Sequence, residues 1–289
     1  MKPQSCILCS AQSCDGTLES ARVRSNVRAF RDNEYGVWRC GSCRSIHATE
    51  NVDLALHYAA YPFHDLSRDI RLAIVYSKLL SRLRRAGLRR SSTLLDYGCG
   101  SGAFVEFLRE RGYGLAVGYD EYNPKMARPD RLRSRYDFVL AQDVIEHVDA
   151  PLALLARLGD LASPGAAVAI GTPDAERLDL ARANDFIHTL HAPYHRHIFS
   201  RRALERSTAA LGWALERRYD TMYTNTLVPF MNEAFYRFYA GLFDDTLDAL
   251  FGPVNPAVLL RNLPRALWTG VFGSFASRRT DPMTIFRRP

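Results

Sequence analysis

Short apolar runs that end in polar or glycine residues recur along the middle of the chain. One such run, 94–95, leads into an acid and three alternating glycines, and the runs at 115–119 and 138–140 are each followed by further acids. Runs of this kind are typical of strands buried on both faces of a parallel sheet. Residues 103–108 between them show the spacing of a helix. We therefore predict an α/β fold with helices on both faces of the sheet.

The same periodicity predicts the elements around this unit. Apolar residues at helical spacing predict a helix over 70–83 that leads into the sheet. Further elements are expected as a strand at 166–170, a helix at 201–211 capped by Ser200, and strands at 215–219 and 282–286. Aromatic residues at helical spacings between the last two strands predict a helical insertion over 222–281. It is expected either as extra core, as a dimer surface, or as a lid whose helices form the acceptor pocket.

The turn after the first strand carries glycines in the spacing G-x-G-x-G, at Gly98, Gly100 and Gly102. Glycine lets the backbone turn sharply and approach a ligand without a Cβ clash, and the following helix offers free N–H groups. The dinucleotide fingerprint has a different spacing, G-x-G-x-x-G. Asp96 precedes the turn, and Asp120 ends the next strand, where an acid can accept hydrogen bonds from both ribose hydroxyls.

These residues resemble motif I of class I S-adenosylmethionine (SAM)-dependent methyltransferases. The sequence DVIEHV at 143–148 resembles motif IV of the members that act on small molecules, and 194–200 resembles the segment before their last helix. The resemblance covers 93–219 and the last strand. It implies a Rossmann-like sheet that binds SAM through Asp96, Gly98, Gly100, Gly102, Asp120, Gln142 and Asp143. Residues 121–136 are too few for the family's usual third strand, so we predict no adenine-contacting acid there.

Two C-x-x-C pairs lie near the N-terminus and are separated by a β-rich segment, 23–38. This arrangement resembles a zinc ribbon, in which four thiolates bind one structural zinc ion. The expected ligands are Cys6, Cys9, Cys40 and Cys43. Cys14 and Cys99 are expected to take no part, and His47 is an alternative ligand. Because so small a ribbon cannot bury a core, we expect the metal to fold it.

These features predict three parts of the chain. They are a zinc ribbon at 1–50, a helical connector at 51–92, and a methyltransferase domain at 93–289 that contains the insertion. In the connector, Tyr58 and Tyr61 are expected either over the cofactor or in the core.

The formal net charge of +7 raises the question of nucleic-acid binding. Arginine carries nearly all of the basic charge, and the clusters at 82–85 and 89–90 are expected on the solvated face and end of one helix. We therefore expect no nucleic-acid partner. No signal-like apolar stretch opens the sequence, and no uncharged apolar run reaches membrane-spanning length. We expect a cytoplasmic monomer or homodimer.

The predicted reaction is SAM-dependent methyl transfer to a small molecule, such as a sugar or a secondary metabolite. His147 and His195 are candidate general bases, since histidine has a suitable pKa, although each is equally interpreted as a packed or capping residue. A metal held by His188, His191 and His195 is a less favoured hypothesis. Two other functions stay open: an RNA methyltransferase whose ribbon recognises its substrate, and a non-catalytic SAM-binding regulator.

Overall fold

A six-stranded sheet forms the centre of the computed structural model, which describes residues 5–11, 19–59 and 69–289. The strand order is β5-β4-β6-β7-β10-β9. The first four of these strands are parallel, and β10 is antiparallel to both of its neighbours. This arrangement confirms the predicted α/β fold. The strands are β4 (Leu94–Tyr97), β5 (Ala116–Tyr119), β6 (Tyr136–Gln142), β7 (Ala162–Gly171), β9 (Ala214–Tyr219) and β10 (Met283–Arg287).

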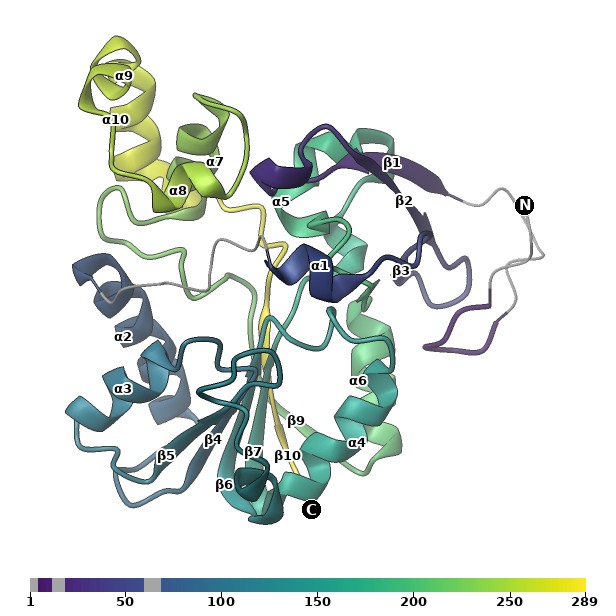
Figure 1. The fold of residues 1–289 in the computed structure, drawn as a ribbon. Coiled ribbons are helices and arrows are strands. Elements are labelled where there is room, and N and C mark those ends of the chain that lie inside the picture. The colour runs from purple at the N-terminus through teal and green to yellow at the C-terminus, as the bar shows by residue number, and fades with distance from the viewer. Residues whose placement is uncertain (1–4, 12–18, 60–68) are drawn as a thin grey trace.

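Helices cover both faces of the sheet (Figure 1). Alternation along β6 separates the two faces: Phe138 and Leu140 pack with α2 and α3, whereas Val139 and Ala141 pack with α4 and α6. Each fully buried Leu or Phe side chain stabilises the fold by roughly 1.5–3 kcal/mol. The helices are α2 (Ile70–Arg85), α3 (Ala103–Glu110), α4 (Pro151–Leu161) and α6 (Arg201–Ala210).

Polar side chains set the starts of two helices. Asp69 Oδ1 accepts a hydrogen bond of 3.0 Å from the N–H of Leu72 at the start of α2. Ser200 Oγ accepts a 3.0 Å bond from the N–H of Ala203, which confirms the predicted cap of α6.

The DVIEHV sequence suggests a helix that opens at Glu146 and His147, but these residues lie in a turn, where the N–H of His147 donates to Val144 O at 3.0 Å. The helix begins at Pro151, since proline suits the first helical position and lacks the N–H that the helix interior needs. This shift leaves both side chains at the carboxyl end of β6.

A second sheet contains the N-terminal strands in the order β1-β2-β3-β8. Its last strand, β8, comes much later in the sequence than the other three, after β7. In this sheet Ile46 pairs with Ile198 and His47 with His197. The sheet packs on η4 (Leu180–Phe186) and α5 (Ile187–Leu190). The strands are β1 (Ser20–Arg24), β2 (Glu34–Arg39), β3 (Ile46–Ala48) and β8 (His197–Ile198).

Three of the N-terminal cysteines belong to the large core that α4 and α6 share with the central sheet, namely Cys6, Cys40 and Cys43. The N-terminal segment therefore does not depend on a core of its own. Its apolar side chains pack on the rest of the molecule, so the premise that the ribbon has no core to pack on is wrong. That the metal folds this segment stays a prediction.

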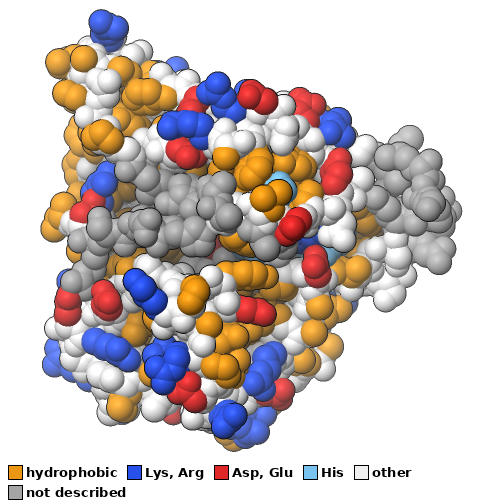
Figure 2. Space-filling view, viewed as in Figure 1, with side chains coloured by type: hydrophobic (Ala, Val, Ile, Leu, Met, Phe, Trp, Pro, Cys, Tyr) orange, Lys and Arg blue, Asp and Glu red, His pale blue; other side chains and the backbone are white. Residues whose placement is uncertain are grey.

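Helices between β9 and β10 form the predicted insertion and lie beyond the same end of the sheet as the N-terminal strands (Figure 1). An ion pair of 2.6 Å between Arg28 and Asp244 joins the insertion to the N-terminal segment, and Leu247 N–H donates to Asn26 O. Apolar side chains gather on its outer surface at the upper left of Figure 2. The helices are α7 (Glu233–Gly241), α8 (Asp248–Phe251), α9 (Pro256–Arg261) and α10 (Leu263–Phe272).

The arginine cluster on α2 is only partly solvated, contrary to the expectation. Arg84 and Arg85 are exposed, but Arg82 is buried, and its guanidinium donates to Thr221 O at 2.7 Å. This arginine holds the chain that leaves β9 instead of facing solvent. In the described part of the chain, no helix combines the length and apolar character needed to cross a membrane.

Candidate active site

The glycine loop after β4 has the backbone conformation that only glycine adopts readily. Gly98, Gly100 and Gly102 have φ angles of +76°, +55° and +83°. A Cβ on Gly98 would lie 2.3 Å from Val144 Cγ2, in the turn that follows β6. At Gly100, by contrast, no described atom comes within 4 Å of the Cβ position. The loop is therefore packed tightly against its neighbours at its first glycine and has room at its second.

Asp120 at the end of β5 fastens this loop. Its Oδ2 accepts from Gly100 N–H at 2.9 Å, and its Oδ1 accepts from Tyr122 N–H at 2.9 Å and Asn123 N–H at 3.0 Å. A carboxylate offers about four acceptor positions, so three are already used by the backbone. The expectation that Asp120 accepts both ribose hydroxyls therefore requires one of these bonds to be exchanged on binding.

Other carboxyl groups lie at the same edge of the sheet, where Asp96 is buried and Asp143 and Asp281 are partly buried. Burial raises the pKa of Asp96, which is 5% exposed, to about 7, and the nearby charge of Asp120 adds to the effect. Burial likewise raises the pKa of Asp143 to about 6 and that of Asp281 to about 7. Gln142 Nε2 donates to Asp143 Oδ1 at 3.0 Å. The predicted cofactor residues thus lie together at the carboxyl ends of β4, β5 and β6.

Sequence reasoning missed Asp281 and Tyr223, which lie on the two chain segments that lead into and out of the insertion. Burial raises the pKa of Tyr223, and the charges of Asp143 and Asp96 raise it further. The sequence could have indicated that Asp281 lies at this edge of the sheet, because Asp281 comes just before the antiparallel strand β10. The start of an antiparallel strand lies at the same sheet edge as the carboxyl ends of its parallel neighbours, and Met283 does pair with Gly171.

Glu146, His147 and His195 form a second buried group beside these acids. Glu146 is 0% exposed; its Oε2 accepts from Thr172 Oγ1 at 2.9 Å, and its Oε1 faces His195 Nε2 at 3.9 Å. The rings of His147 and His195 meet edge to face, with centroids 4.6 Å apart. Burial lowers the pKa of His147 to about 4 and that of His195 well below its usual value, so both imidazoles are neutral near pH 7.

Tyr58 on α1 (Leu54–Ala59) shares a 2.9 Å hydrogen bond with His147 Nδ1 and stacks on Tyr122. Tyr58 therefore packs among aromatic rings, and its expected place over the cofactor stays a prediction. Tyr61 lies outside the described residues.

The other two histidines of this segment do not join the group. His188 Nε2 lies 3.2 Å from Asp245 Oδ1, and His191 Nδ1 donates to Asn26 Oδ1 at 2.5 Å. Within the described residues, the metal-ligand clusters are the four cysteines and the Glu146–His147–His195 group. The hypothesis of a metal site built from His188, His191 and His195 is therefore wrong.

The four predicted zinc ligands converge, with all Sγ atoms within 4.8 Å of one another. Cys6 and Cys43 Sγ are 3.6 Å apart, and Cys9 and Cys40 Sγ are 3.7 Å apart. A tetrahedral zinc ion with Zn–S bonds of about 2.3 Å separates its sulfurs by about 3.8 Å. The four thiols therefore fit such an ion.

Two further residues bear on this site. His47 Nε2 lies 3.2 Å from Cys6 Sγ. Cys14 lies outside the described residues, and Cys99 sits half-buried in the glycine loop, where burial raises its pKa.

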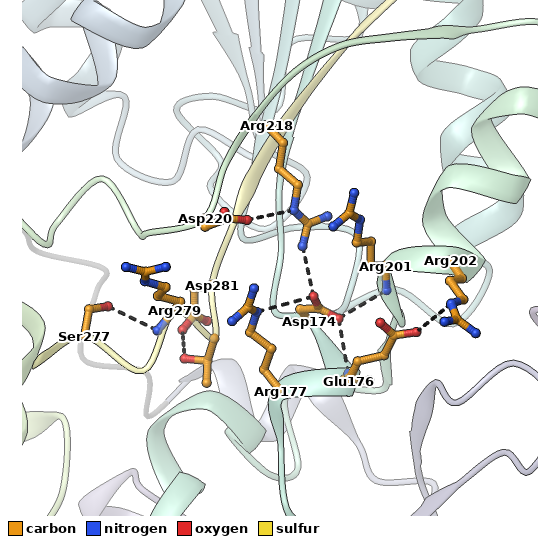
Figure 3. Close-up of polar contacts among 12 residues, drawn as sticks. Asp174, Glu176, Arg177, Arg201, Arg202, Arg218, Asp220, Ser277, Arg279 and Asp281 are labelled. Carbon is orange, nitrogen blue, oxygen red and sulfur yellow. Dashed lines mark hydrogen bonds and ion pairs between the residues drawn. The ribbon is translucent and has the colours of Figure 1, made fainter.

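An ion-pair network around buried Asp174 fixes the chain just beyond the site (Figure 3). Asp174 Oδ2 accepts from Arg218 Nη2 at 2.9 Å, and its Oδ1 accepts from Arg201 N–H at 3.1 Å. Its own N–H donates to Thr280 O at 2.7 Å. Asp174 thereby ties α6 and β9 to the segment that carries Asp281.

Comparison with known proteins bears on what this site does. The family model described as a methyltransferase domain matches residues 68–217. No curated protein matches the chain. Among solved structures, one similar chain is from the complex of the Haloferax volcanii Trm112 methyltransferase activator with a methyltransferase, at 15% identity and a TM-score of 0.46, covering 75% of this chain and 90% of that one.

Two further solved structures are similar. A Galdieria sulphuraria protein named as a sarcosine dimethylglycine methyltransferase has 17% identity and a TM-score of 0.45, with 81% of this chain and 97% of that chain covered. The cyclopropane synthase MmaA2 from Mycobacterium tuberculosis has 17% identity and a TM-score of 0.44, with 78% and 95% covered. The family match itself spans more than half of the 289 residues. The chain therefore belongs to the methyltransferase domain family and is a class I SAM-dependent methyltransferase.

Proposed function

We propose that this enzyme methylates a small molecule, such as a sugar or a secondary metabolite, at the carboxyl edge of the central sheet. The observation that carries the proposal is the burial of the polar groups at this edge. Asp96 is 5% exposed, Glu146 0% and His195 9%. Groups so enclosed suit an acceptor that is surrounded by protein, whereas a polymer is held mainly on an exposed basic surface.

The residues that would hold SAM are the sequence-predicted set. Bound SAM supplies an electrophilic methyl group on a sulfonium, and it also carries an ammonium group. The carboxyl groups of Asp96 and Asp143 favour such a cationic ligand, because a nearby positive charge stabilises their ionised forms. Gly100 has the open space at its Cβ position that close approach of a ligand needs. Asp120 has an acceptor position left for a ribose hydroxyl.

His147 and His195 are proposed to act at the methyl acceptor. Both lie next to Glu146, with His195 buried and His147 partly buried, and both are neutral near pH 7. The ring of Tyr58 packs beside His147, where it would help to exclude water and align the acceptor. The chain's main contribution to the reaction is thus orientation inside a dry site.

A structural zinc ion is proposed at the four cysteines. Four protein ligands leave no open position for chemistry. The ion would hold the N-terminal sheet, whose strand β3 pairs with β8 only two residues after His195. In this way the zinc module would support the histidine segment.

Methyl-labelled SAM tests the acceptor class. The purified enzyme is incubated with labelled SAM and a cell extract of its source organism, and the products are separated by size. We expect label in the low-molecular-weight fraction, and less of it with the Asp120→Ala variant. Label that enters RNA or protein instead would contradict the small-molecule proposal.

A further inference from the structure

One oxygen of Glu146 is buried without a hydrogen-bond partner among the described residues. Its Oε2 is satisfied by the Thr172 hydroxyl, but Oε1 has only His195 Nε2 before it, at 3.9 Å. Burial of an unpaired carboxylate oxygen costs several kcal/mol by general estimates. Such an atom in a fully buried side chain points to a positively charged or proton-bearing ligand.

The facing nitrogen of His195 cannot supply that proton in the neutral ring. His195 Nδ1 lies 2.8 Å from the carbonyl oxygen of Thr189, which only accepts hydrogen bonds, so Nδ1 carries the ring proton. His195 Nε2 therefore presents a lone pair to Glu146 Oε1. Two acceptors that face each other in a buried site repel unless a cation lies between them or the carboxyl group carries a proton, and burial raises the pKa of Glu146. The geometry still suits a metal ion, because a histidine whose other nitrogen donates to a carbonyl is the usual form of a metal ligand.

His147 completes a set of three. Its ligand nitrogen, Glu146 Oε1 and His195 Nε2 belong to a group whose ligand atoms all lie within 4.8 Å of one another. The His147 ring already has two hydrogen-bond partners, the Tyr58 hydroxyl at Nδ1 and the Tyr194 backbone, so a metal ion replaces one of them. Glu146 and His147 are held in the turn after β6, and the N–H groups of Arg196 and His197 donate to the Glu146 carbonyl, which joins this turn to the His195 segment.

We propose that Glu146, His147 and His195 bind a divalent first-row transition-metal ion, in addition to any ion at the four cysteines. An ion about 2.1 Å from each ligand atom sets these atoms about 3.0–3.5 Å apart, so the 3.9 Å pair closes by about half an ångström. One carboxylate and two imidazoles suit zinc, iron(II) or manganese(II) and leave open coordination positions. The two histidines are then metal ligands rather than free general bases.

The ion's role in methyl transfer rests on the proposed function, whereas its binding does not. A hydroxyl oxygen of the acceptor would occupy an open position, and the ion would lower the pKa of that hydroxyl. The hydroxyl proton leaves to solvent, and the oxygen then bonds to the methyl carbon while the carbon–sulfur bond of SAM breaks and its electron pair stays on sulfur. The site thus assigns the acceptor to the class of oxygen nucleophiles.

Total metal content tests the site. Zinc and iron are measured in the purified wild-type enzyme by elemental analysis, and the protein is then titrated with Mn²⁺, whose preference for carboxylate over thiolate directs it away from the cysteines. We expect bound metal and added Mn²⁺ to sum to two ions per chain. A folded wild-type enzyme that binds no metal beyond what the four cysteines hold would overturn the proposal.

Matched variants assign each ion to its site. Glu146→Gln, which keeps the shape of the side chain, should lower the sum to one and leave the cysteine-bound zinc in place. His188→Ala should leave two, because His188 pairs with Asp245 outside the group. If Glu146→Gln keeps two ions, the site is wrong. If the variant does not fold, the total number of metal ions bound per wild-type chain is the test of the proposal.

Calorimetric binding of SAM, measured on the same samples, separates the two proposals. SAM binding without a second ion would refute the metal site and keep the SAM site proposed above. A second ion without SAM binding would keep the metal site and refute the SAM site.

Discussion

At the scale of single residues, burial of carboxyl groups decides what the edge of the sheet binds. Asp96 has a pKa raised to about 7 by burial, next to Asp120. Its stability contribution is therefore fully present below its unfolded pKa, near 4, and is lost as pH rises through about 7. Ionised Asp96 therefore destabilises the folded enzyme, and a cationic ligand that binds beside this carboxylate removes the destabilisation.

Asp96→Asn should therefore be more stable than the wild type in alkaline solution and equally stable near pH 4. At pH 8 we expect its free energy of unfolding to exceed that of the wild type by on the order of 2–4 kcal/mol. Urea denaturation at several pH values measures the difference, with exposed Asp130→Asn as the control. A difference that does not change with pH would contradict the burial account.

Single residues also show where sequence reasoning stopped. The short apolar runs placed Asp120, Gln142 and Asp143 correctly at strand ends, and Asp96 lies one residue before the end of β4. It did not show that three of the acceptor positions of Asp120 are taken by backbone N–H groups, because those bonds depend on the path of residues 121–123. Nor did it single out Glu146 from the DVIEHV sequence, since its unpartnered oxygen is a property of its neighbours in space.

At the scale of elements, the glycine loop is the part most sensitive to substitution. Gly98→Ala would combine a φ of +76° with a Cβ 2.3 Å from Val144 Cγ2. The left-handed conformation costs roughly 1–2 kcal/mol and overpacking roughly 1–3 kcal/mol. We expect thermal unfolding to report a loss within that combined range and SAM affinity to fall. Gly114→Ala is the control, because no described atom lies within 4 Å of its Cβ position; equal losses in both variants would contradict the packing argument.

The N-terminal sheet couples the cysteines to the histidine segment. Cys43→Ser should remove the zinc ion proposed at the cysteines and loosen β3, and the β3–β8 pairing should carry the effect to residues 197–198. Metal analysis would show one ion fewer per chain, and amide hydrogen exchange would show faster exchange in β8. Cys99→Ser should change neither the metal content nor the exchange rate. Slow exchange of β8 in a Cys43→Ser protein that has lost this ion would show that packing alone holds the strand.

The elements also explain how far the sequence could predict the fold. The sheet, its covering helices and the insertion were predictable because their apolar periodicity is strong. The sequence could not predict that β3 and β8 pair in one sheet, since a two-residue strand shows no periodicity. The boundaries of the ribbon and connector at residues 50 and 92 stay predictions.

At the scale of the whole molecule, the net charge of +7 does not form a polymer-binding surface in this account. Arg82 and Arg39 are buried, and Arg218 and Arg196 pair with acids. We therefore expect binding to structured RNA to be no tighter than the non-specific range, about 10⁻⁶ M at physiological salt, and to weaken as salt rises. Filter binding at several salt concentrations measures this. Submicromolar binding at physiological salt would favour an RNA substrate.

The proposed methyl transfer requires SAM to bind at the carboxyl edge of the sheet, where the loops after β4 and β5 meet at Asp120. Titration calorimetry of SAM into the wild type and Asp120→Ala tests this most directly. We expect one SAM per wild-type chain and an affinity lowered by roughly 1.5–3 kcal/mol in the variant, because it loses hydrogen bonds to a charged group. No SAM binding by the wild type, or equal affinity in both proteins, would contradict the account.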